Sequence, residues 1–153
     1  MSDSSQFLGE YSSEELANLK EVFFPQSYID QAQKEVDDIF TLLNIEPKGK
    51  TLLDMPCGVG RHSFPMAERG MQVTGVELCE DYLIQLSKAS AKKGVYYETI
   101  HEDMRTFKRE QTYDVAICLW DSLGICSGLN DDIQILSNLF HSLKPNGQLL
   151  MEV

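Results

Sequence analysis

From Thr51 onward, short apolar segments of strand length alternate with longer stretches in which apolar residues recur at helical spacing. The pattern predicts strands at residues 51–55, 71–77, 95–100, 114–120 and 148–153. Between them it predicts helices at 61–69 and 80–93, and a later helix capped by Asn130. Alternation of this kind implies right-handed parallel crossovers, so we expect an α/β domain built on a doubly wound, mainly parallel sheet.

The apolar positions of the helices indicate which residues share a face. In the helix at 80–93, Leu83, Leu86 and Ala89 point inward, and Gly94 ends the helix. The later helix carries apolar residues at helical spacing, namely Ile133, Leu136, Phe140 and Leu143. The KPNG segment, 144–147, follows that helix and predicts a helix-to-strand connection.

Two helices are predicted before the alternating part begins. Ser12 and Glu15 form a capping-box pattern for the first, and Pro25 interrupts it. The second has an apolar face and ends at the EPKGK segment; that face comprises Ala32, Val36, Ile39, Phe40 and Leu43. We therefore divide the chain into an N-terminal helical segment, 1–46, which serves as a lid or a flank, and an α/β domain, 47–153.

The composition is that of a globular domain, with 42% hydrophobic and 24% charged residues in 153. The net charge of −11 argues against nucleic acid as a partner, because phosphate backbones are bound through Lys and Arg. The chain has no apolar run near the roughly 20 residues that cross a bilayer and no secretory signal, so we expect a cytoplasmic protein without a membrane partner. The cysteines show no zinc-like spacing and fit reduced thiols, so we predict no metal; they are Cys57, Cys79, Cys118 and Cys126.

Polar or special residues lie at the ends of four predicted strands: Asp54, Glu77, Asp103 and the pair Trp120–Asp121. In an open α/β sheet, ligands bind outside the carboxyl ends of the strands, where the strand order reverses. We therefore expect these positions to share one rim and to form a ligand site.

The turn after the first strand is glycine-rich. Gly58 and Gly60 let the backbone approach a ligand closely, and the N–H groups of the turn suit an electron-rich group such as a carboxylate. The alternative is a tight strand-to-helix turn in which backbone N–H groups satisfy Asp54. The turn alone does not decide between the two.

The acids that follow the next two strands suggest a nucleotide-like ligand. Glu77 lies roughly 20 residues after the glycine turn, where a carboxylate reaches ribose hydroxyls in nucleotide-binding units. A helix-dipole charge is the alternative, a role equally open to Glu80 and Asp81. Asp103 is positioned to accept from an adenine amino group while Met104 packs on the ring, and an ordinary polar loop is the alternative.

With these residues in order, the chain resembles class I S-adenosylmethionine-dependent methyltransferases from about Glu35 to Val153. LLDMPCGVGRHS is similar to the family's acid and glycine-rich turn, VTGVELCEDYL to its ribose-binding segment, and EDMRTF to its adenine-contacting segment. YDVAICLWDSLG resembles the fourth-strand motif beside the transferred methyl group, and LKPNGQLLMEV the approach to the fifth strand.

The resemblance implies a three-layer Rossmann-like fold and methyl transfer from S-adenosylmethionine, with S-adenosylhomocysteine as the product, to a small-molecule acceptor. It implies a cofactor-binding set of Asp54, Pro56, Cys57, Gly58, Gly60, Glu77, Leu78, Tyr82, Asp103, Met104 and Leu119. Trp120 and Asp121 are candidates for the acceptor side, with a core position as the alternative for Trp120. No catalytic base is assigned, since positioning does most of the work when the acceptor is already nucleophilic.

The chain departs from the family at two places. Pro56 stands where the family usually has glycine, and since proline has no N–H, the turn must rely on Cys57 and Gly58 as donors. The sequence also ends at Val153, before the two further strands of the family's sheet. We therefore expect a sheet truncated after the fifth strand, and either a longer protein or a homodimer that covers this apolar edge.

Two other functions stay open on the sequence. A dinucleotide-binding oxidoreductase domain would carry a third glycine, which the CGVGRHS segment lacks. A non-catalytic module that binds S-adenosylmethionine or a partner protein is the other alternative, because of the missing strands.

Overall fold

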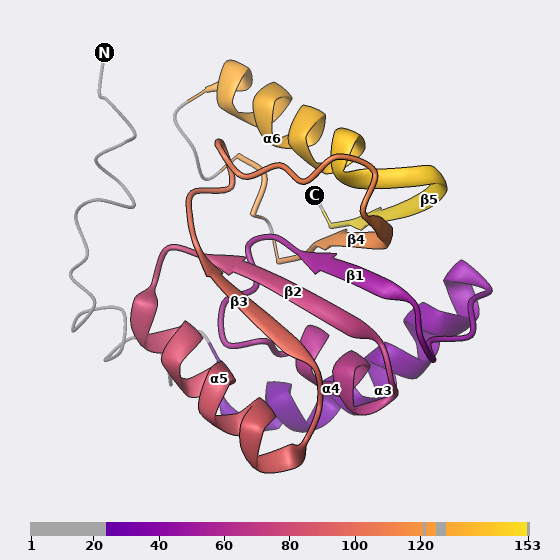
Figure 1. Ribbon diagram of the computed structural model, residues 1–153. Coiled ribbons are helices and arrows are strands. Elements are labelled where there is room, and N and C mark those ends of the chain that lie inside the picture. The colour runs from indigo at the N-terminus through magenta and orange to yellow at the C-terminus, as the bar shows by residue number, and fades with distance from the viewer. Residues whose placement is uncertain (1–23, 121, 125–127, 153) are drawn as a thin grey trace.

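A computed structural model of the chain describes residues 24–120, 122–124 and 128–152 (Figure 1). The first predicted helix, with its capping box, lies outside the described residues. The same is true of Asp121, Cys126 and Val153.

One parallel sheet of five strands, in the order β3-β2-β1-β4-β5, forms the centre of the molecule. The strands are β1 (Thr51–Asp54), β2 (Gln72–Glu77), β3 (Tyr97–His101), β4 (Tyr113–Cys118) and β5 (Leu143–Met151). The chain runs outward from β1 to β3 and then returns to the other side of β1. This reversal places the switch point between β1 and β4 and confirms the doubly wound parallel sheet.

Helices cover both faces of the sheet, which gives three layers (Figure 1). One face carries α3 (Gln26–Leu43), α4 (Ser63–Glu68) and α5 (Glu80–Lys93), and the other carries α6 (Leu129–Ser142). The bounds of α5 are those predicted, with acids in its first turn, lysines in its last turn and Gly94 in the left-handed conformation after it. Each of these features stabilises a helix end.

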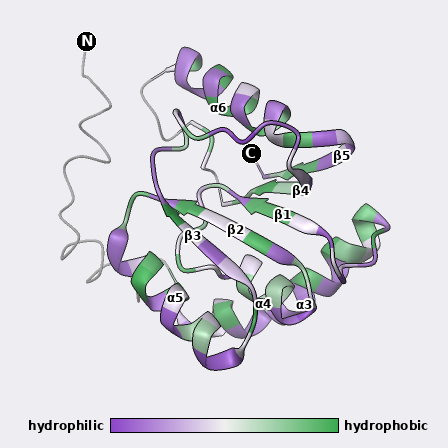
Figure 2. Ribbon diagram, viewed as in Figure 1, coloured by the Kyte–Doolittle hydropathy of each residue, from purple (hydrophilic) through white to green (hydrophobic). Residues whose placement is uncertain are grey.

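Neighbouring residues of the central strands belong to two separate cores, because successive side chains point to opposite faces. Leu52 packs in the core beneath α3, α4 and α5, whereas Leu53 packs in the core beneath α6. In β4, Ile117 lies in the first core and Ala116 in the second. Burial on both faces explains the consecutive apolar residues of the central strand β1, which are green in Figure 2.

Several predicted element bounds are wrong by a few residues. The helix predicted at 61–69 is only Ser63–Glu68, so Arg61 and His62 belong to the glycine turn. Strand β3 begins at Tyr97, after Val95, because the Val95 N–H still bonds to Ser90 at the end of α5. Helix α3 ends before a left-handed Asn44, ahead of the EPKGK segment.

Strand β4 ends at Cys118, which leaves Trp120 outside the strand in which the pattern placed it. The φ angle of Trp120 is +65°, a left-handed conformation that an extended strand does not contain. Trp120 is half-buried, so its position is not that of a core residue.

Helix α6 differs from the prediction in its cap and in its packed face. Gly128 occupies the N-cap position and no side chain caps the helix, so Asn130 does not have the predicted role. Ile135 and Leu139 are fully buried, whereas Ile133 is 55% and Phe140 72% exposed. Two of the four residues that the sequence singles out, Ile133 and Phe140, are therefore on the solvent side, whereas Leu136 and Leu143 are half-buried.

The KPNG segment lies inside β5 and not before it. Pairing with β4 begins at Leu143, opposite Tyr113, and continues at Gln148, opposite Val115, with an irregularity between. Asn146 takes a left-handed φ of +65° there. β5 is the last strand in the sheet order, and its side chains are half-buried or exposed.

Candidate functional site

The glycine turn lies at the switch point, between the carboxyl ends of β2 and β4. Asp54, the last residue of β1, pairs with Gly75 of β2 on one side and Ile117 of β4 on the other. Glu77 ends β2, and its carboxylate accepts the Gly58 N–H at 2.9 Å. The structure thus brings together Asp54, the turn and Glu77, as the position of the strand ends predicts.

Glu77 is held by backbone groups of two segments. Its Oε1 accepts the N–H groups of Leu78 and Cys79 at 2.8 and 3.0 Å, and its Oε2 accepts that of Gly58. A carboxylate has about four acceptor positions, so these bonds leave Oε2 with capacity for a hydroxyl donor. Leu78, next to it, is 39% exposed on the rim.

The N–H groups of the turn are used within the protein, contrary to the expectation that Cys57 and Gly58 serve as its donors to a ligand. The Cys57 N–H donates to the Val76 carbonyl at 2.9 Å, and the Gly58 N–H donates to Glu77. The reason is that the turn lies directly against the end of β2, whose Val76 carbonyl and Glu77 carboxylate accept both N–H groups. Gly60, with a φ of +72°, closes the turn through its N–H to the Cys57 carbonyl.

Asp54 lies beneath this turn and is 5% exposed. Burial raises the pKa of its carboxyl from 3.8 to about 7. The negative charge of Glu77 adds to this shift, whereas a hydrogen bond from Ser63 opposes it. Ser63 also contacts the Tyr97 hydroxyl, with 2.7 Å between the two oxygens. Asp54 is therefore a buried acid joined to a small polar network at the end of β1.

Asp103, on the loop after β3, is engaged by Arg105. Its carboxylate accepts from the Arg105 backbone N–H at 2.8 Å and from the guanidinium at 2.6 Å. Met104 is 6% exposed and packs in the core beneath α6, and its carbonyl accepts from Asn138. These contacts fix the loop beside the rim, and the adenine contact stays a prediction.

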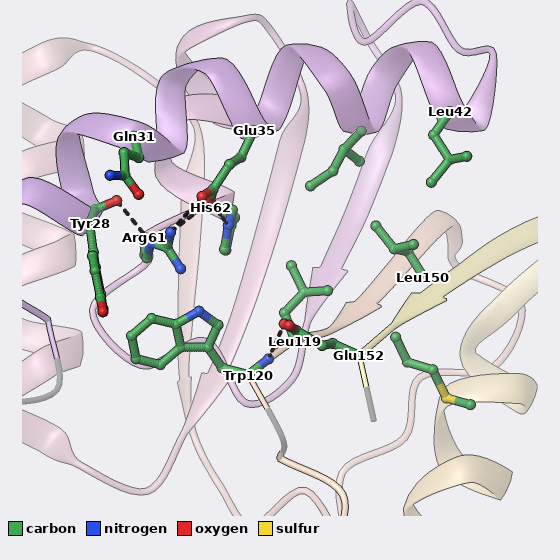
Figure 3. A pocket seen from close by; sticks show the side chains of 12 residues that line it. Tyr28, Gln31, Glu35, Leu42, Arg61, His62, Leu119, Trp120, Leu150 and Glu152 are labelled. Atoms are coloured by element: carbon green, nitrogen blue, oxygen red, sulfur yellow. Dashed lines mark hydrogen bonds and ion pairs between the residues drawn. The ribbon is translucent and has the colours of Figure 1, made fainter.

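A cavity of about 560 Å³ opens between α3 and the ends of β4 and β5 (Figure 3). Trp120 and Tyr28 lie at one end of it, and apolar side chains of α3 and β5 lie at the other. Its lining comprises Tyr28, Gln31, Glu35, Ile39, Leu42, Arg61, His62, Leu119, Trp120, Leu150, Met151 and Glu152. Trp120, which follows β4 at the rim, thus also lines a cavity large enough for a small molecule.

Arg61 joins the glycine turn to α3, and sequence reasoning missed it. Its guanidinium donates to both carboxylate oxygens of Glu35, at 2.9 and 2.7 Å, and its Nε donates to the Tyr28 carbonyl. The guanidinium carbon lies 4.9 Å from the centroid of the Trp120 ring, within cation–π range. The sequence signal for Arg61 is weak, because the position directly after Gly60 reads as the start of a helix.

His62 lies beside Arg61 and shares its acidic partner. His62 Nε2 is 2.8 Å from Glu35 Oε2. Burial lowers the pKa of His62, while the bond to Glu35 opposes this shift. The cavity therefore has a polar wall in which one carboxylate holds a guanidinium and an imidazole together.

Comparison with known proteins supplies the identification. Residues 52–147 match the family described as "Methyltransferase domain". The chain belongs to this methyltransferase family. The match begins in β1 and ends within β5, so it includes β2, β3, β4, the glycine turn and Glu77. It confirms the resemblance drawn from the sequence motifs.

Individual relatives of this methyltransferase domain agree. The protein YqeM of Bacillus subtilis is 33% identical over 70% of the chain, and the ubiquinone biosynthesis O-methyltransferase of Idiomarina loihiensis is 33% identical over 66%. A solved SAM-dependent methyltransferase from Thiobacillus denitrificans, in complex with S-adenosyl-L-homocysteine, is 26% identical, with a TM-score of 0.62. That likeness covers 77% of this chain and 47% of the solved one.

The chain spans 43% of the length of YqeM and 41% of that of the Idiomarina enzyme. Within the described ranges, no cluster of three His, Cys, Asp or Glu side chains is arranged to hold a metal ion. The helices of the same ranges include none with the length and apolarity needed to cross a bilayer.

Proposed function

We propose that this chain is the cofactor-binding part of a methyltransferase that moves a methyl group from S-adenosylmethionine to a small-molecule acceptor. The observation that carries the proposal is the bond between Glu77 and the Gly58 N–H, which joins the turn after β1 to the end of β2, beside the switch point. The S-adenosyl-L-homocysteine bound to the Thiobacillus relative supports it.

The residues of the rim fit this cofactor. Glu77 keeps acceptor capacity for a ribose hydroxyl, and Gly58 has no side chain of its own above the backbone of the turn. Tyr82 is buried beside the rim and, with Leu78, Asp103 and Met104, would bound the adenosine end. Asp54 and the turn of residues 56–60 would hold the amino-acid end. When bound, S-adenosylmethionine supplies an electrophilic methyl group on a sulfonium centre.

We place the acceptor in the 560 Å³ cavity beside Trp120, which has the volume of a small-molecule site. Leu119 and Trp120 line this cavity, and Asp121, the other acceptor-side candidate, lies outside the described residues. The net charge of −11 favours a small acceptor over nucleic acid. The name of the Idiomarina relative, an O-methyltransferase of ubiquinone biosynthesis, is consistent with a small acceptor.

Calorimetric titration tests the cofactor. We expect S-adenosylmethionine and S-adenosylhomocysteine to bind and NADH not to bind. Binding of NADH alone would overturn the proposal in favour of the oxidoreductase alternative.

Transfer of a labelled methyl group to a panel of small molecules tests the enzyme activity. The chain is assayed by itself and, if its gene encodes more, within the whole protein, because the matches cover only 43% of YqeM and 41% of the Idiomarina enzyme. Cofactor binding without transfer to any acceptor would favour the non-catalytic module.

Two further expectations belong to the same proposal. Among the described strands, β5 is an edge strand, and this position supports self-association of this chain into a homodimer. The free thiols of Cys57, Cys79 and Cys118 are consistent with a cytoplasmic location.

A further inference from the structure

The ring of Phe24, the residue before the Pro25 cap of α3, lies on the rim of the cofactor site. It stacks on Trp120 with 5.4 Å between ring centroids and 13° between ring planes. It also meets Tyr82 edge-on, with centroids 6.0 Å apart. Tyr82 lies in α5, the helix that follows β2, and Trp120 follows β4. The Phe24 ring therefore extends across the rim from the β2 side to the β4 side.

The same ring fills the space above the glycine turn. A Cβ atom built on Gly58 would lie 3.1 Å from Phe24 Cζ, which is closer than ordinary van der Waals contact. Gly58 has a φ of +52°, and its missing side chain leaves room for one neighbouring group. Phe24 takes that room.

Hydrogen bonds from Arg61 hold α3 against the glycine turn. Arg61 is 9% exposed, and it donates to the Tyr28 carbonyl and to both Glu35 oxygens (Figure 3). The Tyr28 ring meets Trp120 edge-on at 5.7 Å. Tyr28 lies in the first turn of α3 and Glu35 in its third, so Arg61 ties the helix that follows Phe24 to the glycine turn.

We propose that Phe24 is an internal plug of the cofactor site, which occupies the space between Gly58, Tyr82 and Trp120 until S-adenosylmethionine displaces it. The inference rests on the proposed function, because the rim of Gly58 and Glu77 is where the cofactor is placed. A cofactor that runs along this rim and the Phe24 ring require the same volume above Gly58, so only one of them occupies it at a time.

Competition of this kind lowers the apparent affinity for the cofactor. The measured dissociation constant equals the intrinsic one divided by the fraction of molecules in which the site is open. The plug therefore makes cofactor binding depend on movement of the chain at Phe24.

Calorimetric titration with S-adenosylhomocysteine tests the plug in the wild-type chain and in the variants F24A and F140A. We expect F24A to bind at least about threefold more tightly than the wild type, because the open fraction rises. F140A is the matched control, since Phe140 is 72% exposed on α6 on the other face of the sheet, and we expect wild-type affinity. Unchanged or weaker binding by F24A would show that the ring does not compete with the cofactor.

A second measurement does not depend on the alanine variant. The seven phenylalanines are replaced by 4-fluorophenylalanine, and the ¹⁹F resonance of Phe24 is assigned with the variant F24L. On addition of S-adenosylhomocysteine, we expect this resonance to move towards the position of the exposed Phe140. A resonance that stays in place while calorimetry records binding would overturn the plug alone, whereas absence of binding to all variants would overturn the proposed function.

Discussion

At the scale of single residues, two neighbouring carboxyl groups of the site, those of Glu77 and Asp54, have opposite surroundings. Glu77 is surrounded by backbone N–H donors that satisfy its charge. Asp54 is buried, and its pKa rises to about 7 because burial penalises the charged form. Glu77 is therefore suited to accept a hydrogen bond from a ligand, whereas Asp54 makes the free energy of unfolding depend on pH.

We expect the free energy of unfolding of the wild type to fall as pH rises through 7, and the variant D54N to lack this fall. A carboxyl whose folded pKa is above its unfolded value of 3.8 stabilises the fold at low pH, and this contribution disappears as pH rises through 7. Asparagine does not ionise, so the free energy of unfolding of D54N relative to wild type should increase by about 2–3 kcal/mol between pH 5 and pH 8. Urea denaturation at the two pH values measures it.

The comparison between the two proteins isolates Asp54. The pKa values of Glu98 and Asp114 are lowered, with hydrogen bonds to Arg109 and to Thr51 and Lys144 opposing burial, so these acids act in the other direction. Their effect is common to both proteins and cancels in the difference. Parallel pH profiles for D54N and wild type would contradict a raised pKa at Asp54.

We expect the variant E77A to weaken S-adenosylhomocysteine binding by at least about tenfold. A charge-assisted hydrogen bond contributes roughly 1.5–3 kcal/mol, and loss of about 1.4 kcal/mol is a factor of ten. E80A is the matched control, because Glu80 is an exposed acid three residues along the chain. If a folded E77A kept the wild-type dissociation constant, Glu77 would not belong to the cofactor site.

At the scale of elements, α6 has apolar residues on two faces, and the sheet contacts only one. Ile135 and Leu139 are fully buried, whereas Leu129, Ile133 and Phe140 are between 55% and 74% exposed. Helical spacing alone does not distinguish the two faces, since each has apolar side chains one turn apart. The side that packs is set by the way the chain leaves β4 and enters β5.

The variants L139A and F140A test this assignment with neighbouring residues. We expect L139A to lower the free energy of unfolding by roughly 2–5 kcal/mol, because a buried leucine leaves a cavity. F140A should stay within about 0.5 kcal/mol of wild type, as surface substitutions usually do. Urea denaturation gives both values, and a larger loss for F140A would mean that the opposite face of α6 is packed.

At the scale of the whole molecule, β5 and β3 are the two edge strands of the sheet that the described residues form. Met151 is 41% exposed at the end of β5. The apolar side chains Leu42, Leu150 and Met151 line the cavity next to this edge. An open strand with adjacent apolar surface promotes association between copies of the chain.

We therefore expect the average mass of this chain in multi-angle light scattering to rise towards that of a dimer as its concentration increases. The variant M151K should reduce the effect, since a lysine at a strand edge hinders pairing. K88M reverses the chemistry at an exposed site on α5, away from β5, and serves as the control. A wild-type chain that stays monomeric at high concentration would exclude association through β5.

The sequence alone determined the order of the elements, the parallel sheet and the residues at the strand ends. These properties are local: apolar periodicity distinguishes strands from helices, and the carboxyl ends of parallel strands meet at one rim. Asp54, the glycine turn and Glu77 were therefore predictable as neighbours. The bounds of α5 were predictable because acids, lysines and Gly94 mark its ends.

The tertiary structure decided which distant side chains meet. Arg61 and Glu35 are separated by 26 residues, and no periodic pattern joins them. The stack of Phe24 on Trp120 and the packed face of α6 likewise depend on how helices lie against the sheet. Local pattern specifies elements through the backbone, whereas these contacts depend on packing between segments that the sequence does not place side by side.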